Sequence, residues 1–353
     1  MKLKTLAVSL TLAASNVFAA NLPAEEKVDP QEQKILKALE SLNPKPLHTL
    51  TPEEARKGPT AKDAVEKVLK DEGKPTTPEK VDSVVSKSIT TAQGNLKVRV
   101  YTPEGPGPFP GIVYFHGGGF VIADLDVYDS GARALVNQGK AVLVSVAYRL
   151  APEHPYPAAP DDAVSAFNYV HDHPSEFKVD SNRLAVAGES AGGNLATVVS
   201  IRQKATGKPM PIAQVLVYPF VTQDVSSPSH KKNGKGNYIL GNADIAWFWK
   251  YYLGDGWSKN RDGYALPIYA TTDQLRGLPP TLIITAGLDP LMDEGQTYAK
   301  NLRAARVKVD VKNYPGVTHE FFGMAAALDK AKQAQADAGV FLRKSFLGPS
   351  SEP

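Results

Sequence analysis

Five compact apolar runs constrain the fold of this chain more than any other feature of its sequence. They are "GIVYF" (111–115), "AVLVSVAY" (141–148), "RLAVAG" (183–188), "AQVLVYP" (213–219) and "TLIITAG" (281–287). Continuous runs rich in Val and Ile are typical of parallel strands that are buried on both faces. Helical patterns such as "VYDSGARALVNQG" and "PDDAVSAFNYVHDH" separate several of them. The alternation predicts an α/β fold with a mostly parallel central sheet flanked by helices.

Two segments fall outside this rhythm. Residues 20–80 contain the amphipathic stretches "QKILKALESL" and "AKDAVEKVLKDEG", which predict short surface helices. Residues 222–265 are polar and Gly-rich at "KKNGKGN" and aromatic at "AWFWKYY". A structureless loop of that length is unusual in a compact domain, so we expect a folded insertion there. We predict that both segments form a cap over one end of the sheet.

The remaining boundaries follow from these assignments. Before the first apolar run, "VDSVVSKSITT" and "LKVRVYTP" alternate as antiparallel edge strands do. The stretch 325–347 predicts a last helix that packs on the sheet, and 348–353 predicts a loose tail. The expected division is a leader at 1–19, an N-terminal helical cap segment at 20–80, a core in two parts at 81–221 and 266–347, and a cap insertion at 222–265.

The first twenty residues have the pattern of a secretory signal. Lys2 and Lys4 precede an apolar run and then small residues, with the expected cut after Ala19. A buried N-terminal helix is the alternative interpretation. No later run reaches the ~18 apolar residues of a membrane span, so stable membrane insertion is not expected. We therefore predict an exported protein, periplasmic or secreted.

Charge and cysteine content exclude several classes of partner. The chain has 40 basic and 37 acidic residues, and two of the lysines lie in the leader, so the remainder is 38 against 37. This balance gives no support for binding to nucleic acid or to a membrane surface. There is no cysteine, hence no disulfide and no thiolate metal site. The sequence leaves open whether the protein is a monomer or a dimer.

The pentapeptide "GESAG" (188–192) fits the pattern G-x-S-x-G. It follows the strand-like "RLAVA" and precedes the helical "NLATVVSIRQKA". Such a turn needs glycines because the strand bends sharply into a helix while the serine takes strained backbone angles. The turn would expose the hydroxyl of Ser190 and aim the N–H of Ala191 at a developing oxyanion. An ordinary turn is the alternative for this motif alone.

A second glycine-rich motif, "YFHGGGF" (114–120), follows the first apolar run. Gly117, Gly118 and Gly119 can bend so that their N–H groups face one cavity, as in an oxyanion hole. A phosphate-binding loop is improbable because no Lys or Ser/Thr follows in register. We expect His116 to brace this loop.

A nucleophilic serine needs a base and an acid that orients the base. His319, in "GVTHEF" after a strand-like stretch, is the best base by position, and Asp289 follows the strand "TLIIT" directly. We expect Asp293 and Glu294 to begin a helix instead. The other histidines have weaker claims by position: His154 lies in a Pro-rich segment, and His48 and His230 lie away from the expected sheet ends. The spacing of two residues puts His171 and His173 on different helix faces, which argues against a metal site there. The order Ser190, Asp289, His319 is the one expected of α/β-hydrolases.

Five blocks in their order, "HGGGF", "YRLAPEHPYPAAPDD", "GESAGGN", "AGLDPLMDEG" and "GVTHEF", resemble the hormone-sensitive-lipase-like branch (bacterial family IV esterases) of the α/β-hydrolase superfamily over roughly 85–345. The resemblance implies a serine carboxylesterase with a helical cap, acting on short to medium acyl chains and needing no metal or organic cofactor. It gives Ser190 the role of nucleophile, His319 that of base and Asp289 that of orienter, with Gly117, Gly118, Gly119 and Ala191 at the oxyanion. Glu189 and Met292 depart from the more frequent Asp and Arg, and Met292 puts in doubt any ion pair that Arg would make.

Two other functions share these residues. An amidase or peptidase would use the same triad, and a non-catalytic small-molecule-binding relative would keep the fold alone. For acyl-chain selection, the cap aromatics could wall a pocket or simply pack the cap helix; these are Trp247, Phe248, Trp249, Tyr251 and Tyr252.

Overall fold

The structure is a computed structural model that describes residues 26–348. The predicted leader (1–19) and most of the predicted tail lie outside the described residues. One eight-stranded sheet runs through the molecule in the order β1-β2-β4-β3-β5-β6-β7-β8. Its strands are β1 (Ser83–Thr91), β2 (Gly94–Thr102), β3 (Phe109–Phe115), β4 (Val142–Ala147), β5 (Val179–Glu189), β6 (Gln214–Val217), β7 (Thr281–Ala286) and β8 (Val309–Tyr314).

The pairing of these strands matches the sequence prediction. β1 pairs with β2, and β2 with β4, in antiparallel fashion, and every later neighbour is parallel. β6 and β7 are buried along their whole length, which explains why their sequences are continuous apolar runs and do not alternate. The α/β fold with a mostly parallel sheet and an antiparallel entry is therefore confirmed.

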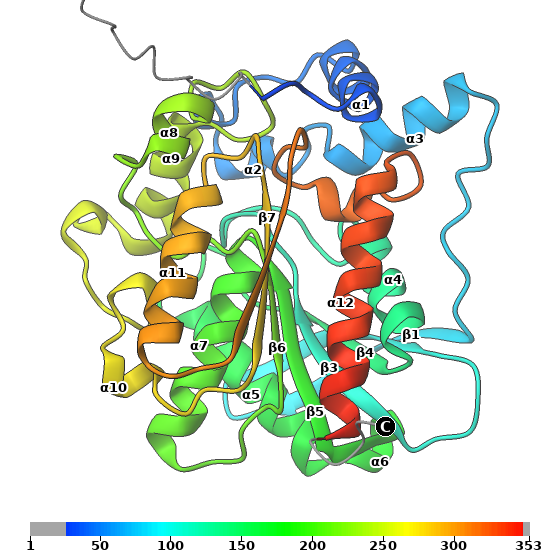
Figure 1. The fold of residues 1–353 in the computed structure, drawn as a ribbon, viewed down its shortest axis with the longest axis vertical. Helices are drawn as coiled ribbons and strands as arrows, with labels where there is room; N and C mark the ends of the chain where they lie inside the picture. Colours follow the sequence, from blue (N-terminus) through cyan, green and yellow to red (C-terminus); the bar gives the residue numbers. More distant parts are fainter. Residues whose placement is uncertain (1–25, 349–353) are drawn as a thin grey trace, which may run out of the picture.

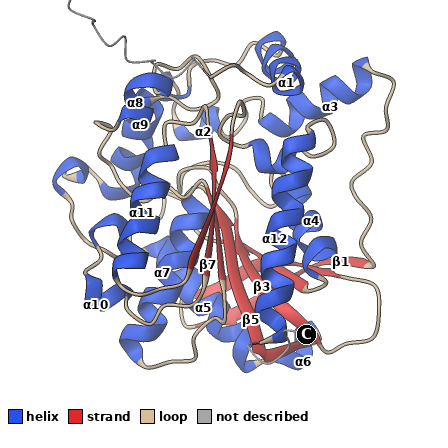
Figure 2. Cartoon of the chain, in the orientation of Figure 1, coloured by secondary structure: helices blue, strands red, loops and turns tan. Residues whose placement is uncertain are grey.

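Helices cover both faces of the sheet (Figures 1 and 2). α4 (Asp129–Gly139) and α12 (Asp329–Leu347) pack on one face, against residues such as Ile112 and Leu143. α5 (Ala158–Asp172), α7 (Ala191–Thr206) and α11 (Met292–Ala304) pack on the other, against residues such as Val113 and Leu216. The short helices α6 (Pro174–Phe177) and α10 (Thr272–Leu275) complete the core.

One predicted boundary is wrong. The last helix was expected over 325–347, but α12 begins at Asp329. Leu328 precedes it with extended backbone angles, φ −135° and ψ 115°, which cannot continue a helix. The three alanines before it lie in a turn that follows the short helix η4 (Phe321–Met324). Alanine's high helix propensity is overridden here because Met324 and Leu328, on either side of the turn, are buried in the core and fix the path of the chain between them.

The helices of the two segments assigned to a cap lie together at one end of the sheet (Figure 1). They are α1 (Pro30–Ser41), η1 (Leu47–Thr49), α2 (Pro52–Ala55) and α3 (Ala61–Asp71) from the first segment, and α8 (Pro228–Asn233), α9 (Asn242–Leu253) and η2 (Trp257–Lys259) from the second. The indole N–H of Trp247 donates to the carbonyl oxygen of Leu50 at 3.0 Å, and the ring of His48 lies 2.9 Å from Asp244. These contacts join segments about 200 residues apart in the sequence.

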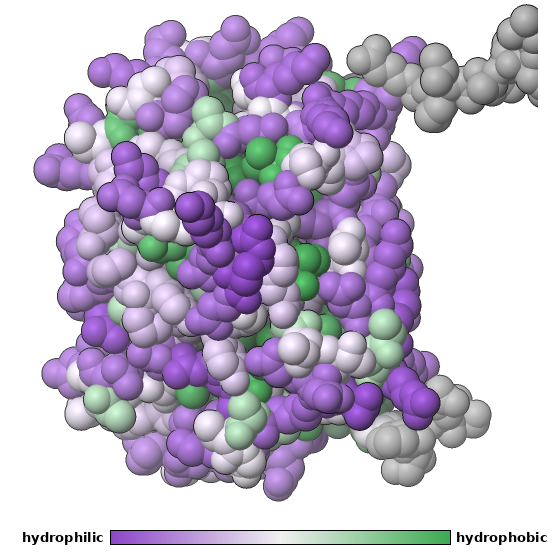
Figure 3. All heavy atoms as spheres, turned by 90° about the vertical axis from the view of Figure 1, so that its left-hand side faces the viewer, coloured by the Kyte–Doolittle hydropathy of each residue, from purple (hydrophilic) through white to green (hydrophobic). Residues whose placement is uncertain are grey.

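The surface over α8 to α11 is mostly hydrophilic, with small and separate hydrophobic areas (Figure 3). The aromatic side chains of α9 face inward, because Trp247, Phe248, Trp249 and Tyr252 are all buried. Among residues 26–348, no helix combines the length and the apolar character needed to cross a bilayer.

Candidate active site

Ser190 occupies the turn between β5 and α7. Its backbone angles, φ 55° and ψ −116°, lie in a region that non-glycine residues rarely adopt. A Cβ atom on Gly188 would collide with the carbonyl of Gly192, and one on Gly192 would collide with the carbonyl oxygen of Phe115. The two glycines therefore let β5, α7 and the end of β3 approach closely enough to hold a strained serine.

Asp289 and His319 lie on the loops that follow β7 and β8. The Nε2 atom of His319 lies 3.0 Å from the Oγ of Ser190, and its Nδ1 lies 2.8 Å from Oδ2 of Asp289. The second oxygen of Asp289 accepts a hydrogen bond from the N–H of Leu291 at 2.9 Å, which fixes the carboxylate. All three side chains are buried. In the structure, the imidazole of the predicted base thus lies between the hydroxyl of the predicted nucleophile and the carboxylate of the predicted acid.

The pKa of His319 reflects opposing influences. Burial alone would lower it, but the carboxylate of Asp289, followed by those of Glu320 and Glu189, raises it above its ordinary value. The ring also packs against Tyr218, with the ring centroids 4.5 Å apart. Several negative groups around one imidazole favour its protonated form, which is the form a base takes during catalysis.

The two acidic residues that competed with Asp289 have other partners. Asp293 and Glu294 lie in the first turn of α11, as predicted. Asp293 accepts a hydrogen bond from the N–H of Ser229, and Glu294 lies 3.2 Å from the ring of His230. Neither is in contact with His319 among the hydrogen bonds and ion pairs of the described residues.

The glycine loop follows β3 and lies beside the serine turn. Gly118 and Gly119 have positive φ angles of 94° and 59°, which glycine adopts readily. A Cβ atom on Gly119 would collide with the ring of Phe248, and one on Gly117 with the hydroxyl of Tyr128. Within residues 26–348, the N–H groups of Gly118, Gly119 and Ala191 donate to no protein acceptor. N–H groups of this kind can donate hydrogen bonds to an oxyanion.

His116 braces this loop, as expected. Its ring is buried and stacks on Tyr148 at a centroid distance of 4.4 Å. Its Nδ1 lies 2.8 Å from the carbonyl oxygen of Gly117, and the hydroxyl of Tyr148 donates to the carbonyl oxygen of His116 at 2.9 Å. Burial lowers the pKa of His116 to about 4, so the ring is neutral near pH 7.

The cap aromatics divide between packing and the site. Trp249 and Tyr252 pack with Phe120 and Phe220 in one aromatic cluster, with centroid distances of 3.9 Å for Phe120–Tyr252 and 4.1 Å for Phe220–Trp249. Phe248 lies directly over the Cα of Gly119. Phe248 is thus placed against a glycine of the loop itself, whereas Trp249 and Tyr252 pack on the side chain of Phe120.

Sequence reasoning missed His230. Its place in the sequence predicts a position away from the sheet ends, but it is buried, and its helix α8 is hydrogen-bonded to the loop of Asp289. Its partner Glu294 accepts from the N–H of Val221 at 2.7 Å, and Asn233, from the same helix, donates to the carbonyl oxygen of Asp289 at 3.3 Å. No local sequence pattern marks this arrangement, because it depends on how α8 folds back.

Two further carboxylates, the buried Glu189 and the partly exposed Glu320, were also missed as members of the site. Glu189 accepts hydrogen bonds from the hydroxyls of Tyr114 and Tyr218. Glu320 accepts from Tyr128 at 2.6 Å. Its position directly after the predicted base was the available signal. In the described part of the chain, no group of three or more metal-ligating side chains is placed to hold a metal ion.

Comparisons with known proteins identify the family to which this fold belongs. Residues 112–323 match the protein family described as having the alpha/beta hydrolase fold. A carboxylic ester hydrolase, LipN, of Mycobacterium tuberculosis is 42% identical over 68% of this chain and 65% of its own length. The esterase LipI of the same organism is 39% identical over 75% of this chain and 83% of its own length.

A solved structure has the same architecture. It is a thermostable esterase from Pseudomonas putida ECU1011, which superposes with a TM-score of 0.80 at 34% sequence identity. The superposition covers 91% of this chain and 98% of that chain. The likeness therefore includes the cap helices as well as the sheet.

Proposed function

Because this chain belongs to the α/β-hydrolase family and is a carboxylic ester hydrolase of its hormone-sensitive-lipase-like branch, we propose that Ser190, His319 and Asp289 are its catalytic triad. The observation that carries the proposal is the pair of contacts made by His319, 3.0 Å to Ser190 and 2.8 Å to Asp289. The hydroxyl and the carboxylate thus lie at opposite nitrogens of one imidazole, as the chemistry requires.

In the proposed reaction, the Oγ of Ser190 attacks the ester carbonyl while Nε2 of His319 accepts its proton. Asp289 holds the ring and stabilises the imidazolium that forms. His319 then gives the proton to the leaving alcohol, and an acyl-serine remains. Water, deprotonated by His319, attacks the acyl group, and Ser190 recovers its proton as the carboxylic acid leaves.

The oxyanion of each tetrahedral intermediate is stabilised by the N–H of Ala191 and by two of the three N–H groups of Gly117, Gly118 and Gly119. Fixed donors of this kind are effective because they need no reorganisation when the charge develops. The positive φ angles of Gly118 and Gly119 support this role. No cofactor takes part in these steps.

The substrates we propose are small esters of short to medium acyl chain. Phe248 supports this choice because its ring lies over Gly119 and limits the room beside the glycine loop. Phe248→Ala should move the rate profile across p-nitrophenyl esters towards longer acyl chains. Tyr251→Ala is the matched control, because Tyr251 packs on Trp247 in the same helix.

The test of the triad is Ser190→Ala. Hydrolysis should fall by at least about 10³-fold, and a serine-directed phosphonate should label the parent protein at Ser190 alone. Near-normal hydrolysis by the variant would refute the proposal. A matched ester and amide pair, measured in parallel, separates an esterase from an amidase with the same triad.

Export is also part of the proposal. Lys2 and Lys4 before an apolar run support a cleaved leader. The amino-terminal sequence of the protein recovered from cells should begin at Ala20, and retention of residues 1–19 would exclude cleavage.

A further inference from the structure

Glu320 approaches the base from the side that faces the nucleophile. Its Oε1 lies 3.8 Å from Nε2 of His319, the nitrogen that also contacts Ser190. Asp289, by contrast, is in contact with the other nitrogen, Nδ1. The imidazole therefore lies between two carboxylates, and the second one is nearest the atom that carries the transferred proton.

The position of Glu320 is held by its surroundings. The hydroxyl of Tyr128 donates to Oε1 at 2.6 Å, and the side chain is 19% exposed. The backbone of Glu320 has φ 71°, in the left-handed region that glutamate rarely adopts. In this conformation, Oε1 of Glu320 lies 3.8 Å from the ring of the preceding residue.

Glu189 adds a third negative group to the same cluster. It does not contact the imidazole, but it holds the hydroxyl of Tyr218, whose ring packs on His319. Burial, and then the negative charge of Glu320, raise the pKa of Glu189 to about 7. The pKa of Glu320 is raised by burial in turn. A positive charge on His319 is therefore stabilised by the neighbouring carboxylates.

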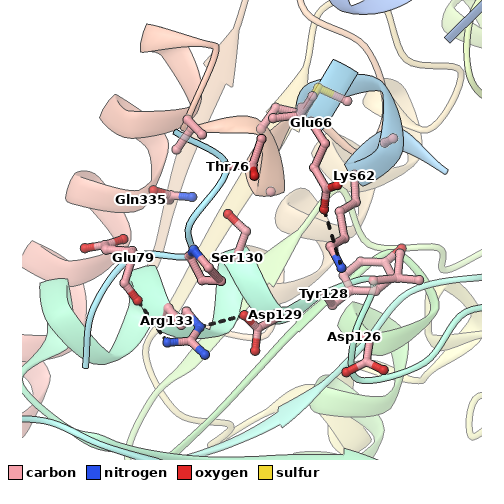
Figure 4. A pocket seen from close by; sticks show the side chains of 18 of the residues that line it. Lys62, Glu66, Thr76, Glu79, Asp126, Tyr128, Asp129, Ser130, Arg133 and Gln335 are labelled. Carbon is pink, nitrogen blue, oxygen red and sulfur yellow. Dashed lines mark hydrogen bonds and ion pairs between the residues drawn. The ribbon is translucent and has the colours of Figure 1, made fainter. Parts of the chain in front are cut away.

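A cavity of about 940 Å³ reaches this cluster from outside, between α3, α4 and α12 (Figure 4). Among the described residues, its lining includes Tyr128, Glu189 and Glu320 but neither Ser190 nor His319. Its charged side chains near α4 pair with one another, as Arg133 does with Asp129 at 2.6 Å. The cavity therefore gives Glu320 access to solvent from the side away from the nucleophile.

We propose that Glu320 is a second carboxylate partner of His319, positioned by Tyr128, which stabilises the imidazolium formed when Ser190 gives up its proton. Because His319 is buried, the attraction between its imidazolium and the carboxylate of Glu320 is stronger than it would be between two groups in water. Glu320 acts through His319 and is a positioning residue. The inference rests on the proposed triad.

The effect on pH dependence has a definite sign. The titratable groups that face the pair from neighbouring elements are Asp289, Glu189, Tyr114, Tyr128 and Tyr218. His319 acts as a base only when it is neutral, so kcat/KM falls as the pH drops below its pKa. Loss of the negative charge at Glu320 lowers that pKa, and the acid limb of the profile moves to lower pH.

The experiment is Glu320→Gln, which keeps the shape and an acceptor for Tyr128. We expect the acid limb of kcat/KM to move down by about half to one pH unit and the plateau kcat to fall by about 3- to 10-fold with KM little changed. Glu104→Gln, an exposed carboxylate 77% accessible to solvent, is the control for net charge and should keep the parent profile. An unchanged acid limb in folded Glu320→Gln overturns the proposal.

Two further variants keep the test decisive if Glu320→Gln fails to fold. Glu320→Asp withdraws the charge by one methylene, and Tyr128→Phe removes the hydroxyl that holds it. Each variant should move the acid limb of kcat/KM by less than Glu320→Gln does. Acid limbs equal to that of the parent in both variants would also overturn the proposal. An error in the proposed triad can be distinguished from an error in the role of Glu320. If the triad is wrong, Ser190→Ala keeps its activity or the phosphonate does not label Ser190.

Discussion

The buried carboxylate of Glu32, in α1, accepts a hydrogen bond from the hydroxyl of Thr318, the residue immediately before His319. The N–H of Thr318 donates to the same oxygen at 3.3 Å. Nearby, the N–H of Asp29 donates to the carbonyl oxygen of Gly316 at 2.8 Å. A helix near the start of the chain thus fixes the loop of the base, which comes almost 300 residues later.

Replacement of Glu32 should therefore impair catalysis as well as folding. Glu32→Ala leaves the N–H of Thr318 without its buried acceptor, which costs about 1–3 kcal/mol, and the hydroxyl of Thr318 keeps only the carbonyl oxygen of His319 at 3.2 Å. We expect a lower melting temperature and a kcat reduced by about tenfold, measured on a soluble ester. Glu40→Ala, an exposed change on the same helix, should resemble the parent. Equal kcat values for the two variants would show that α1 does not position His319.

The stability of the protein should depend on pH through Glu32. Burial raises the pKa of Glu32 to about 7, although the hydrogen bonds from Thr318 oppose this shift. The second oxygen of Glu32 has no hydrogen-bond partner among the described residues. Between the ordinary value and about 7 the unfolded chain releases this proton first, so stability falls as the pH rises. Glu32→Gln cannot titrate. Its free energy of unfolding relative to the parent should rise by up to about 3 kcal/mol between pH 5 and pH 8; a constant difference would contradict the assignment.

The acid of the triad can be identified by paired amide substitutions. Asp289→Asn should lower kcat by about 10³- to 10⁴-fold, because the ring of His319 loses the partner that fixes its tautomer. Asp293→Asn, four residues on, loses only the contact with Ser229 and should keep most of the activity. Steady-state kinetics with one ester decides the matter. A larger loss of kcat in Asp293→Asn than in Asp289→Asn would instead identify Asp293, in α11, as the acid.

The serine turn should not tolerate a methyl group at Gly192. An added Cβ meets the carbonyl oxygen of Phe115, and backbone atoms of two core elements cannot move apart cheaply. Gly192→Ala should lose about 3 kcal/mol or more of stability in urea denaturation. Gly256→Ala has open space around the new methyl and serves as control. Parent-like stability of Gly192→Ala would mean that the turn is less tightly packed than the structure has it.

The pair of His230 and Glu294 should contribute strongly to stability. Their side chains are 1% and 2% exposed, so removal of one partner leaves a buried group unpaired. His230→Ala should cost about 3–5 kcal/mol, whereas the exposed His154→Ala should cost almost nothing. Chemical denaturation gives both values. A small loss for His230→Ala would indicate that water replaces the imidazole.

The sheet was predictable because strands that are buried on both faces have continuous apolar sequences. β3, β4 and β7 start and end within two residues of their apolar runs. The serine turn was predictable for a similar reason, since the steric demand for Gly188 and Gly192 is local. Asp289 and His319 could be chosen because each directly follows a strand or a strand-like stretch, at the sheet edge where parallel strands place their functional residues.

The supporting groups were not predictable in the same way. His230 reaches the loop of Asp289 only because α8 packs against α11, and Glu32 reaches Thr318 only because α1 lies beside the loop that follows β8. Glu320 adjoins the base in sequence, but the direction of its side chain depends on one left-handed backbone angle. Contacts of this kind arise from tertiary packing and leave no periodic pattern.

The triad is carried by loops that leave β5, β7 and β8, strands that lie within one stretch of the sheet, whereas Phe248 and the helices above the glycine loop come from residues 30–71 and 228–259. The proposed catalytic residues and the helices that cover them thus come from separate stretches of the chain. Substitutions in the covering helices can accumulate and be selected without disturbing the contact between Ser190 and His319. The exceptions are a few tethers, such as Glu32 and Asn233, whose hydrogen bonds join these helices to the loops of His319 and Asp289. Directed evolution of substrate range should therefore randomise the covering helices and leave those tethers unchanged.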